Sequence, residues 1–334
     1  MTDLATSPLF SRMPLSPCGR PLADALYAGM LGQSPSMLQI YADIKNIGQS
    51  QAPVLITGET GTGKDLCAHA IHNHSDRVGH EFTALNCAAL PKELIESALF
   101  GHVKGAFTSA EHAQNGLVEQ AHRGTLFLDE ISEIPHDTQA KLLRFLQDGS
   151  YRPVGGTKEY TSNARIICAT NRDLQHNIQT GHFREDLYYR LNVLDIFMPP
   201  LRLRKKDILL LAEHFLQLYN QEENKSFTGF TDAAQRKLQQ HPWQGNIREL
   251  QNIVRKIVVL HDAKIIDEDI LSRYLEKDAL PVTRQRTKPL WEIEKHAIEH
   301  AIHTCQGNIS KAAALLGINP STIHRKKASW KTME

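Results

Sequence analysis

The 334-residue sequence lacks the marks of several special classes of protein. No apolar run reaches the ~18 residues that a membrane-spanning helix needs. The N-terminal residues contain no basic cluster followed by an apolar core, as a secretory signal would. The absence of any CxxC pair argues against a disulfide framework or a zinc site. The five cysteines are Cys18, Cys67, Cys87, Cys168 and Cys305. These absences predict a cytoplasmic protein with reduced cysteines and no membrane contact.

Net charge is also nearly absent, at +1, but its distribution is uneven. Residues 284–334 hold nine Lys or Arg and four Asp or Glu, a net charge of +5 for this segment. A slightly acidic body with a basic end predicts a polyanionic partner for the end only. With 41% hydrophobic residues and this length, a globular chain of about two domains is expected.

Short apolar runs alternate with helical patterns over the first two thirds of the chain. Five of these runs are expected to be strands, at residues 53–57, 82–86, 125–129, 164–170 and 192–198. They are almost continuously apolar, as expected when helices cover both faces of a parallel sheet. The alternation therefore predicts an open α/β sheet.

The pattern changes after Pro199 and Pro200, where helical periodicity continues without further strand signals. The polar, proline-containing composition of the next stretch predicts a linker before a last helical segment. The predicted organisation is a lead-in at 1–30, an α/β subdomain at 31–200, a helical subdomain at 201–276, a linker at 277–289 and a C-terminal helical domain at 290–334.

The first predicted strand runs into a glycine-rich loop and then a helical pattern. This strand–GxxxxGK–helix order is that of a P-loop, whose backbone N–H groups and lysine hold nucleotide phosphates. The candidate nucleotide residues are Gly58, Glu59, Thr60, Gly61, Thr62, Gly63, Lys64 and Asp65. Asp65 stands where a Ser or Thr is usual, so a hydroxyl ligand for Mg²⁺ has to come from elsewhere, such as water. A glycine-rich turn that binds nothing is the plain alternative, and the strand–loop–helix context disfavours it.

Polar residues follow two further predicted strands. Asp129 and Glu130 end one strand, where Asp129 suits Mg²⁺ positioning and Glu130 suits polarisation of the attacking water. Asn171 ends the next and is placed to sense the γ-phosphate or orient water. Two acids at a strand end are usually just solvated, but beside a P-loop they favour hydrolysis of ATP with Mg²⁺.

Together these residues resemble an AAA+ ATPase of the NtrC-like family of bacterial enhancer-binding proteins, which activate sigma-54 RNA polymerase. The resemblance extends from about Gly32 onward and is most specific at residues 93–110, ELIESALFGHVKGAFTSA, which is similar to the family's ELFGH…GAFTGA region. It implies a surface loop that contacts the sigma factor, formed by Gly105, Ala106, Phe107, Thr108, Ser109 and Ala110, with Phe107 and Thr108 at the tip. Ser109 replaces a family glycine, which costs free energy if the loop needs a positive φ there.

The resemblance also implies roles for other residues. Asn86 in LNCAAL would restrain the water-activating glutamate, and Arg248 in WQGNIRELQN would report nucleotide to the helical lid. Arg184 and Arg190 in FREDLYYRLNV would be arginine fingers for the ATP of a neighbouring subunit. For any one of these arginines a surface salt bridge is the plain alternative. Fingers supplied by a neighbour imply a homo-oligomer, from dimer to hexamer, with the active form a ring.

The C-terminal segment has the turn chemistry of a helix-turn-helix. Gly317 suits the residue after a helix, and Asn319-Pro320 suits the start of the next. This segment resembles a Fis-type DNA-binding domain, with candidate DNA contacts at Ser321, Thr322, His324, Arg325, Lys326 and Lys327. An amphipathic three-helix tail with a solvated basic face is the alternative.

His69, His72 and His74 are close together, but no third ligand follows at a metal-binding spacing. We therefore predict that they form a solvent-facing side of a helix.

These observations predict an ATP-dependent activator that binds DNA upstream of a promoter. Hydrolysis in a ring would move the 105–110 loop against sigma-54 RNA polymerase and open the promoter. Because the lead-in is shorter than a domain, we expect no receiver domain and control by abundance or a partner protein. Two alternatives stay open: a regulator that uses ATP without acting through sigma-54, suggested by Ser109, and an AAA+ replication initiator or helicase loader.

Overall fold

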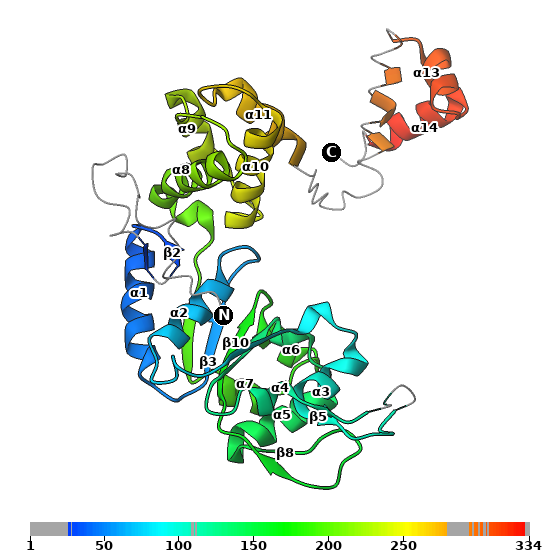
Figure 1. Cartoon of the computed structure of the whole chain (residues 1–334). Helices are drawn as coiled ribbons and strands as arrows, with labels where there is room; N and C mark the ends of the chain where they lie inside the picture. Colours follow the sequence, from blue (N-terminus) through cyan, green and yellow to red (C-terminus); the bar gives the residue numbers. More distant parts are fainter. Residues whose placement is uncertain are drawn as a thin grey trace. The chain divides into compact units, whose positions relative to one another are not determined.

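The computed structural model describes residues 26–27, 29–107, 110, 112–278, 294–295, 297–299, 301–302, 305 and 307–330. The chain divides into two compact units, Met1–Leu275 and Glu276–Glu334, each described here by itself (Figure 1). Among the described helices, none is both long enough and apolar enough to cross a membrane.

A five-stranded parallel sheet is the centre of the first unit. Its strand order is β11-β3-β10-β7-β4, so β3 and β10 lie between other strands. Each strand lies within two residues of an expected run, which confirms the α/β class: β3 (Val54–Thr57), β4 (Phe82–Asn86), β7 (Thr125–Asp129), β10 (Arg165–Thr170) and β11 (Leu194–Phe197).

Helices cover both faces of this sheet because alternate strand residues point to opposite sides. Val54 and Ile56 share one core with α1 (Pro35–Gly48) and α2 (Lys64–Asn73). Leu55 faces a second core, on the opposite side of the sheet (Figure 1). The helices on or near that side are α3 (Lys92–Phe100), α4 (Leu117–Gln120), α5 (His136–Asp148), α6 (Leu174–Gln179) and α7 (Glu185–Leu191).

Regular structure begins at Leu26, within the expected lead-in at residues 1–30. β1 (Leu26–Tyr27) and β2 (Met30–Leu31) form an antiparallel hairpin ahead of α1. Met30 and Leu31 are buried, which ties this hairpin to the body of the first unit. Residues 1–25 and 28 lie outside the described part of the chain.

Four helices form the predicted helical subdomain around its own core. Trp243 is fully buried in that core, and its Nε1 donates to the Leu238 carbonyl at 2.8 Å. The helices are α8 (Lys205–Glu222), α9 (Asp232–Gln240), α10 (Asn246–Leu260) and α11 (Glu268–Asp278). Residues 277 and 278, expected in a linker, are the end of α11, and residues 279–289 lie outside the described part of the chain.

Gln33 and Ser34, the two residues before α1, are hydrogen-bonded to Asp207 in the first turn of α8. Asp207 is fully buried and accepts from Gln33 N at 2.7 Å, Ser34 N at 2.9 Å and Ser34 Oγ at 2.7 Å. Arg204 balances this buried carboxylate, with Nε 3.3 Å from Asp207 Oδ2. A buried charge is tolerated only when paired and hydrogen-bonded, and these contacts meet that need.

The second unit contains α13 (Ile309–Leu315) and α14 (Pro320–Trp330), with helical residues also at 294–295, 297–299 and 301–302. Ala312 and Ala313 are fully buried beside Ile323, so their small side chains allow close helix packing. Gly317 has φ +66°, as the residue after a helix requires.

The prediction for the histidine group is wrong at His72. Its side chain is only 5% exposed, and Nδ1 lies 2.9 Å from Thr125 Oγ1 at the start of β7. His69 is exposed but its ring lies 3.9 Å from that of Phe82, and His74 stacks on Tyr27 at 4.8 Å. Within the described residues no cluster of three or more candidate ligands could hold a metal. One side of α2 packs on the sheet, and this packing decides which histidine is buried. The helical spacing of the histidines alone does not show which side that is.

Burial of His72 makes the stability of the first unit sensitive to acid. Burial, and after it the nearby charges of His69, Arg165, Arg77 and His80, together lower its pKa to about 4. Since the folded-state pKa lies below the ordinary 6.5, the unfolded chain binds the proton first as the pH falls. The stabilising effect of neutral His72 is complete above pH 6.5 and declines toward pH 4.

We expect wild type to lose about 2 kcal/mol more unfolding free energy than His72→Gln between pH 7.5 and 5. Glutamine can still hydrogen-bond Thr125 but does not titrate. Denaturant unfolding at the two pH values measures this difference. His136→Gln, an exposed site, is the matched control and should keep the wild-type slope. Equal slopes for wild type and His72→Gln would contradict the assignment.

Candidate active site

The P-loop connects β3 to α2 and closes over the lysine side chain. Lys64 Nζ donates to the Gly58 carbonyl at 3.0 Å and to the Glu59 carbonyl at 3.3 Å. Lys64 is only 7% exposed, and this burial lowers its pKa, while the charges of Glu130 and Asp129 oppose the change. Thr62 Oγ1 also donates to the Glu59 carbonyl, at 2.8 Å. The loop therefore presents a buried cation at the N-terminus of α2, which suits phosphate oxygens.

Residues after three neighbouring strands converge beside this loop. Asn86 Nδ2 donates to Asp129 Oδ2 at 3.1 Å, and Asn171 N donates to Glu130 Oε2 at 3.2 Å. Asn171 Nδ2 also reaches the P-loop, donating to Thr60 Oγ1 at 2.7 Å. The fold brings these groups together because the carboxyl ends of parallel strands share one edge of the sheet.

The expected contact between Asn86 and Glu130 is not among the described contacts of Asn86, and its role toward Glu130 stays a prediction. Its carboxamide binds Asp129, and its Oδ1 accepts from Ala88 N at 2.9 Å. β4 pairs with β7 so that Asn86 lies opposite Asp129, which explains the partner. Glu130 has φ +53°, a strained conformation for a residue other than glycine, of the kind that persists at functional sites.

Asp129 and Asp65 are near enough for the charge of one carboxylate to act on the other. Burial raises the pKa of Asp129, Lys64 opposes this, and the charge of Asp65 raises it further. Asp65 itself is exposed in the first turn of α2. Mg²⁺ is commonly held by one or two carboxylates together with substrate phosphates and water, so this donor set fits Mg²⁺.

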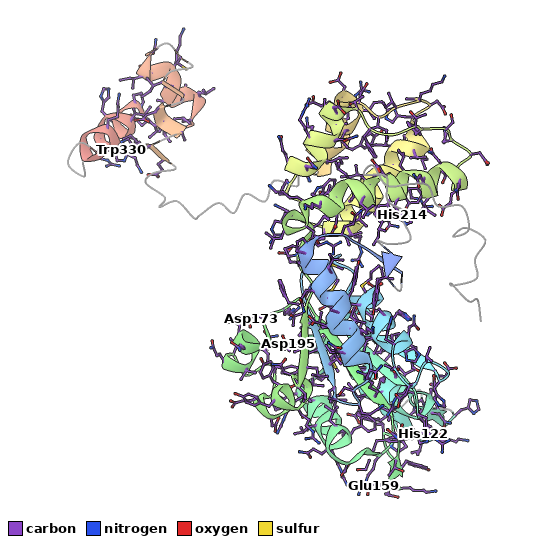
Figure 2. All side chains as sticks on the ribbon, turned by 90° about the vertical axis from the view of Figure 1, so that its left-hand side faces the viewer. His122, Glu159, Asp173, Asp195, His214 and Trp330 are labelled. Carbon is purple, nitrogen blue, oxygen red and sulfur yellow. The ribbon has the colours of Figure 1, made fainter. Side chains whose placement is uncertain are left out.

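An apolar cavity that the sequence analysis missed opens beside the P-loop. Its volume is about 100 Å³, and Thr62, Gly63 and Leu66 form one wall. The other walls come from distant segments and include Met30, Met198, Leu211, His214 and Ile247. His214 lies on α8 (Figure 2), and burial lowers its pKa. Since the lining spans residues 29 to 247, no local pattern could have predicted this cavity.

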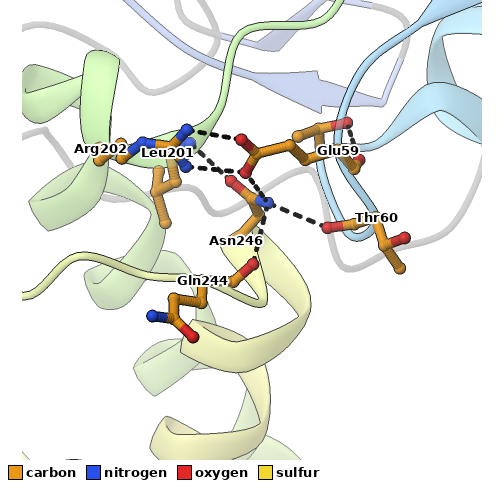
Figure 3. Close-up of polar contacts among 7 residues, drawn as sticks. Glu59, Thr60, Leu201, Arg202, Gln244 and Asn246 are labelled. Atoms are coloured by element: carbon orange, nitrogen blue, oxygen red, sulfur yellow. Dashed lines mark hydrogen bonds and ion pairs between the residues drawn. The ribbon is translucent and has the colours of Figure 1, made fainter. Parts of the chain in front are cut away.

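The helical subdomain touches the P-loop directly (Figure 3). Glu59, predicted among the phosphate residues, directs its carboxylate to this subdomain, where it accepts from Arg202 and Asn246. Ile247 N donates to the Gly61 carbonyl at 2.9 Å. Arg248 is exposed on the first turn of α10; its charge adds to the lowering of the Lys64 pKa by burial and opposes the burial-driven rise of the Asp129 pKa. The subdomain is thus placed as a lid over the loop.

The two candidate arginine fingers lie on or next to α7, apart from this site. Arg184 donates to both carboxylate oxygens of Asp186, at 3.0 and 2.7 Å. Arg190 is exposed, and its Nε donates to the Leu146 carbonyl at 3.3 Å. Neither guanidinium hydrogen-bonds a P-loop group among the described residues.

The candidate sigma-factor loop begins at the β5 (Gly101–His102) and β6 (Gln114–Asn115) hairpin. Gly105 has φ +81°, and its N–H donates to the Ala110 carbonyl at 2.9 Å. The Phe107 ring lies 4.9 Å from that of His102. Thr108 and Ser109 lie outside the described residues, so the φ at Ser109 stays untested.

A second hairpin, β8 (Ser150–Tyr151) and β9 (Tyr160–Thr161), lies against the base of this loop. Val103 N donates to the Val154 carbonyl at 3.1 Å. A Cβ on Gly155 would lie only 2.9 Å from that of Ala106, so the two segments touch closely.

All six candidate DNA contacts lie on α14, and Ile323 between them is turned into the core. Asn319 Oδ1 accepts from Ser321 N at 3.1 Å and starts this helix. Ser321, His324, Arg325 and Lys327 are exposed, Thr322 is half-buried, and Lys326 forms an ion pair with Glu294.

Comparisons with known proteins agree with this architecture. Residues 30–197 match the sigma-54 interaction domain, 202–288 the AAA+ ATPase lid domain and 289–326 the Fis family of bacterial regulatory proteins. The luminescence regulatory protein LuxO of Vibrio campbellii (strain ATCC BAA-1116) is 46% identical over 92% of this chain and 70% of its own length. The regulatory protein AtoC of Escherichia coli (strain K12) is 44% identical, over 89% and 66%. The structure of NtrX from Brucella abortus with ATP is 33% identical, with TM-score 0.66, over 92% and 71%.

A P-loop sheet, a helical lid and a helix-turn-helix define an AAA+ ATPase that regulates transcription. The chain belongs to the sigma-54 interaction domain family, and it is an ATP-dependent activator of sigma-54 transcription. The predicted fold class, ATPase activity and function are confirmed. The alternative of a regulator acting without sigma-54 is not favoured, and the two relatives named above are regulatory proteins.

Proposed function

We propose that this chain hydrolyses ATP with Mg²⁺ at a site shared between two subunits of a ring, up to a hexamer. The separation of Arg184 and Arg190 from the P-loop of their own chain carries this proposal. An exposed guanidinium such as Arg190 is available to a neighbouring subunit, where it can stabilise charge on the transferred phosphoryl group.

Within one subunit, the P-loop and Lys64 bind the phosphates and the apolar cavity takes the base. Asp129 and Asp65 would hold Mg²⁺, which neutralises charge on the phosphates when bound. Glu130 accepts a proton from the attacking water, and Asn171 orients Glu130 through its backbone N–H. Asn86 positions Asp129, and Arg248 adds positive charge from the lid.

Two surfaces then connect hydrolysis to transcription. The 105–110 loop contacts sigma-54 RNA polymerase, with Phe107 and Thr108 at its tip. Polar and basic side chains of α14 bind DNA upstream of the promoter, with Ser321 and Thr322 near base edges and His324, Arg325, Lys326 and Lys327 near phosphates.

ATP turnover as a function of protein concentration tests the shared site. We expect turnover per chain to rise steeply with concentration, because a subunit without a neighbour lacks the arginine. Sedimentation at the same concentrations should show that the rise follows assembly. A turnover per chain that is the same in monomers and assemblies would contradict the shared site.

A further inference from the structure

We propose that Glu59, Arg202 and Asn246 form a clasp by which the lid holds the P-loop in its phosphate-binding shape. The clasp makes the position of the lid and the occupancy of the nucleotide site depend on each other. This inference rests on the proposed function only in taking the P-loop as the phosphate site.

The carboxylate of Glu59 forms its side-chain hydrogen bonds with residues of the lid. Arg202 Nη1 donates to Glu59 Oε2 at 2.7 Å and Arg202 Nη2 donates to Glu59 Oε1 at 2.5 Å, a two-pronged contact (Figure 3). Asn246 Nδ2 adds a third donor to Oε2, at 3.1 Å. The hydrogen bonds from Arg202, and then those from Asn246, hold the pKa of Glu59 below its usual range. A carboxylate with these partners is anionic and cannot approach ATP phosphates without repulsion.

Asn246 is the buried member of the clasp. It is fully buried at the start of α10, and its φ of +54° is one that residues other than glycine rarely adopt. Its Oδ1 accepts from Leu201 N at 2.8 Å, and its Nδ2 donates to the Thr60 carbonyl at 3.0 Å. One amide therefore joins the P-loop, the segment before α8 and the lid. Strain of this kind persists where the surrounding contacts demand it.

Backbone contacts close the clasp. Ile247 N donates to the Gly61 carbonyl, and a Cβ on Gly61, which has φ +79°, would lie 2.4 Å from the Gly245 carbonyl oxygen. The loop and the start of α10 thus touch main chain to main chain. The P-loop cannot shift against α10 without breaking these bonds together.

Hydrogen bonds also connect the clasp to Glu130, the proposed base, through Thr60 and Asn171. Thr60, whose carbonyl binds Asn246, accepts from Asn171 through its hydroxyl. Asn171 in turn holds Glu130. Displacement of the lid would therefore change the hydrogen bonds of the P-loop and, through Asn171, those of Glu130. Coupling along these contacts is an energetic quantity that a double-mutant cycle measures directly.

A double-mutant cycle on the full chain uses Glu59→Gln, Arg202→Gln and the combined variant. Arg202 and Glu59 are both about 40% exposed, so these changes are compatible with folding, which thermal unfolding checks. Affinity is measured with a fluorescent ATP analogue, and kcat and KM are measured with ATP. The matched control is Arg144→Gln, which breaks a similarly exposed ion pair with Glu159 away from the P-loop.

Each single variant is expected to weaken binding of the analogue at least about fivefold, and the double variant no further than the worse single. Arg202→Lys should recover only part of the affinity, because an ammonium cannot donate to both oxygens in the same planar geometry. Affinities equal to that of Arg144→Gln, or losses that add fully in the double variant, would overturn the clasp.

Lys64→Ala separates this inference from the proposed function. If Lys64→Ala abolishes binding of the analogue while the Glu59 and Arg202 variants bind normally, the clasp alone is wrong. If Lys64→Ala binds the analogue as tightly as wild type, the P-loop is not the phosphate site and the proposed function fails with it.

Discussion

Glu130→Gln is expected to lower kcat for ATP hydrolysis by at least about 10²-fold, the usual contribution of a general base. The amide keeps the shape of the side chain and can still accept the hydrogen bond from Asn171 N. It cannot take a proton from water at neutral pH. Because the P-loop and Lys64 are unchanged, binding of ATP should persist within a few-fold. Steady-state turnover and binding of a fluorescent ATP analogue measure the two effects separately.

The matched control for this change is Glu133→Gln. Glu133 lies three residues further along and pairs with Arg172 at 2.5 Å. Its loss should leave kcat within a few-fold of wild type, since exposed ion pairs contribute little. Wild-type turnover by Glu130→Gln would refute the assignment of Glu130 as the base.

Arg190→Ala is expected to lower kcat by about 10³-fold while leaving nucleotide affinity of the free chain nearly unchanged, because the arginine acts on the site of a neighbour. Arg184→Ala should act in the same direction. Its guanidinium must first leave the two-pronged contact with Asp186, so its substitution also frees that carboxylate.

Mixing two inactive variants distinguishes action on a neighbour from action within one chain. Arg190→Ala retains Glu130, and Glu130→Gln retains Arg190. In a mixed ring, an Arg190→Ala subunit beside a Glu130→Gln subunit again has one complete site. Mixing should therefore restore measurable turnover that neither variant shows alone. No recovery in rings shown to contain both variants would mean that the arginine acts in its own chain or is only structural.

The strands were predictable because they are local patterns. The runs at 82–86 and 125–129 coincide with β4 and β7, since residues buried on both faces leave a continuous apolar signal. The P-loop and the acids at the end of β7 were equally readable, because a strand end and a glycine-rich turn need only a few adjacent residues. The order of the strands was not readable from these runs.

Contacts between distant segments account for what the sequence analysis missed. His72 was expected in solvent, yet it is buried against Thr125, 53 residues away. The register between β4 and β7 places Asn86 opposite Asp129, a contact that the sequence did not indicate, while its expected restraint of Glu130 stays a prediction. The contacts of the Glu59 carboxylate with Arg202 and Asn246 were not foreseen either, because these partners lie more than 140 residues further along the chain.

The amino-acid sequence by itself determined the class of fold, the phosphate loop, the acidic strand end and the family of sigma-54 activators. These depend on short patterns whose chemistry is complete within a few neighbouring residues. Only the tertiary structure decided the apolar cavity, the burial of His72 and the contacts between the lid and the P-loop. Each of those joins residues far apart in the chain, and their meeting depends on how whole helices and strands pack together.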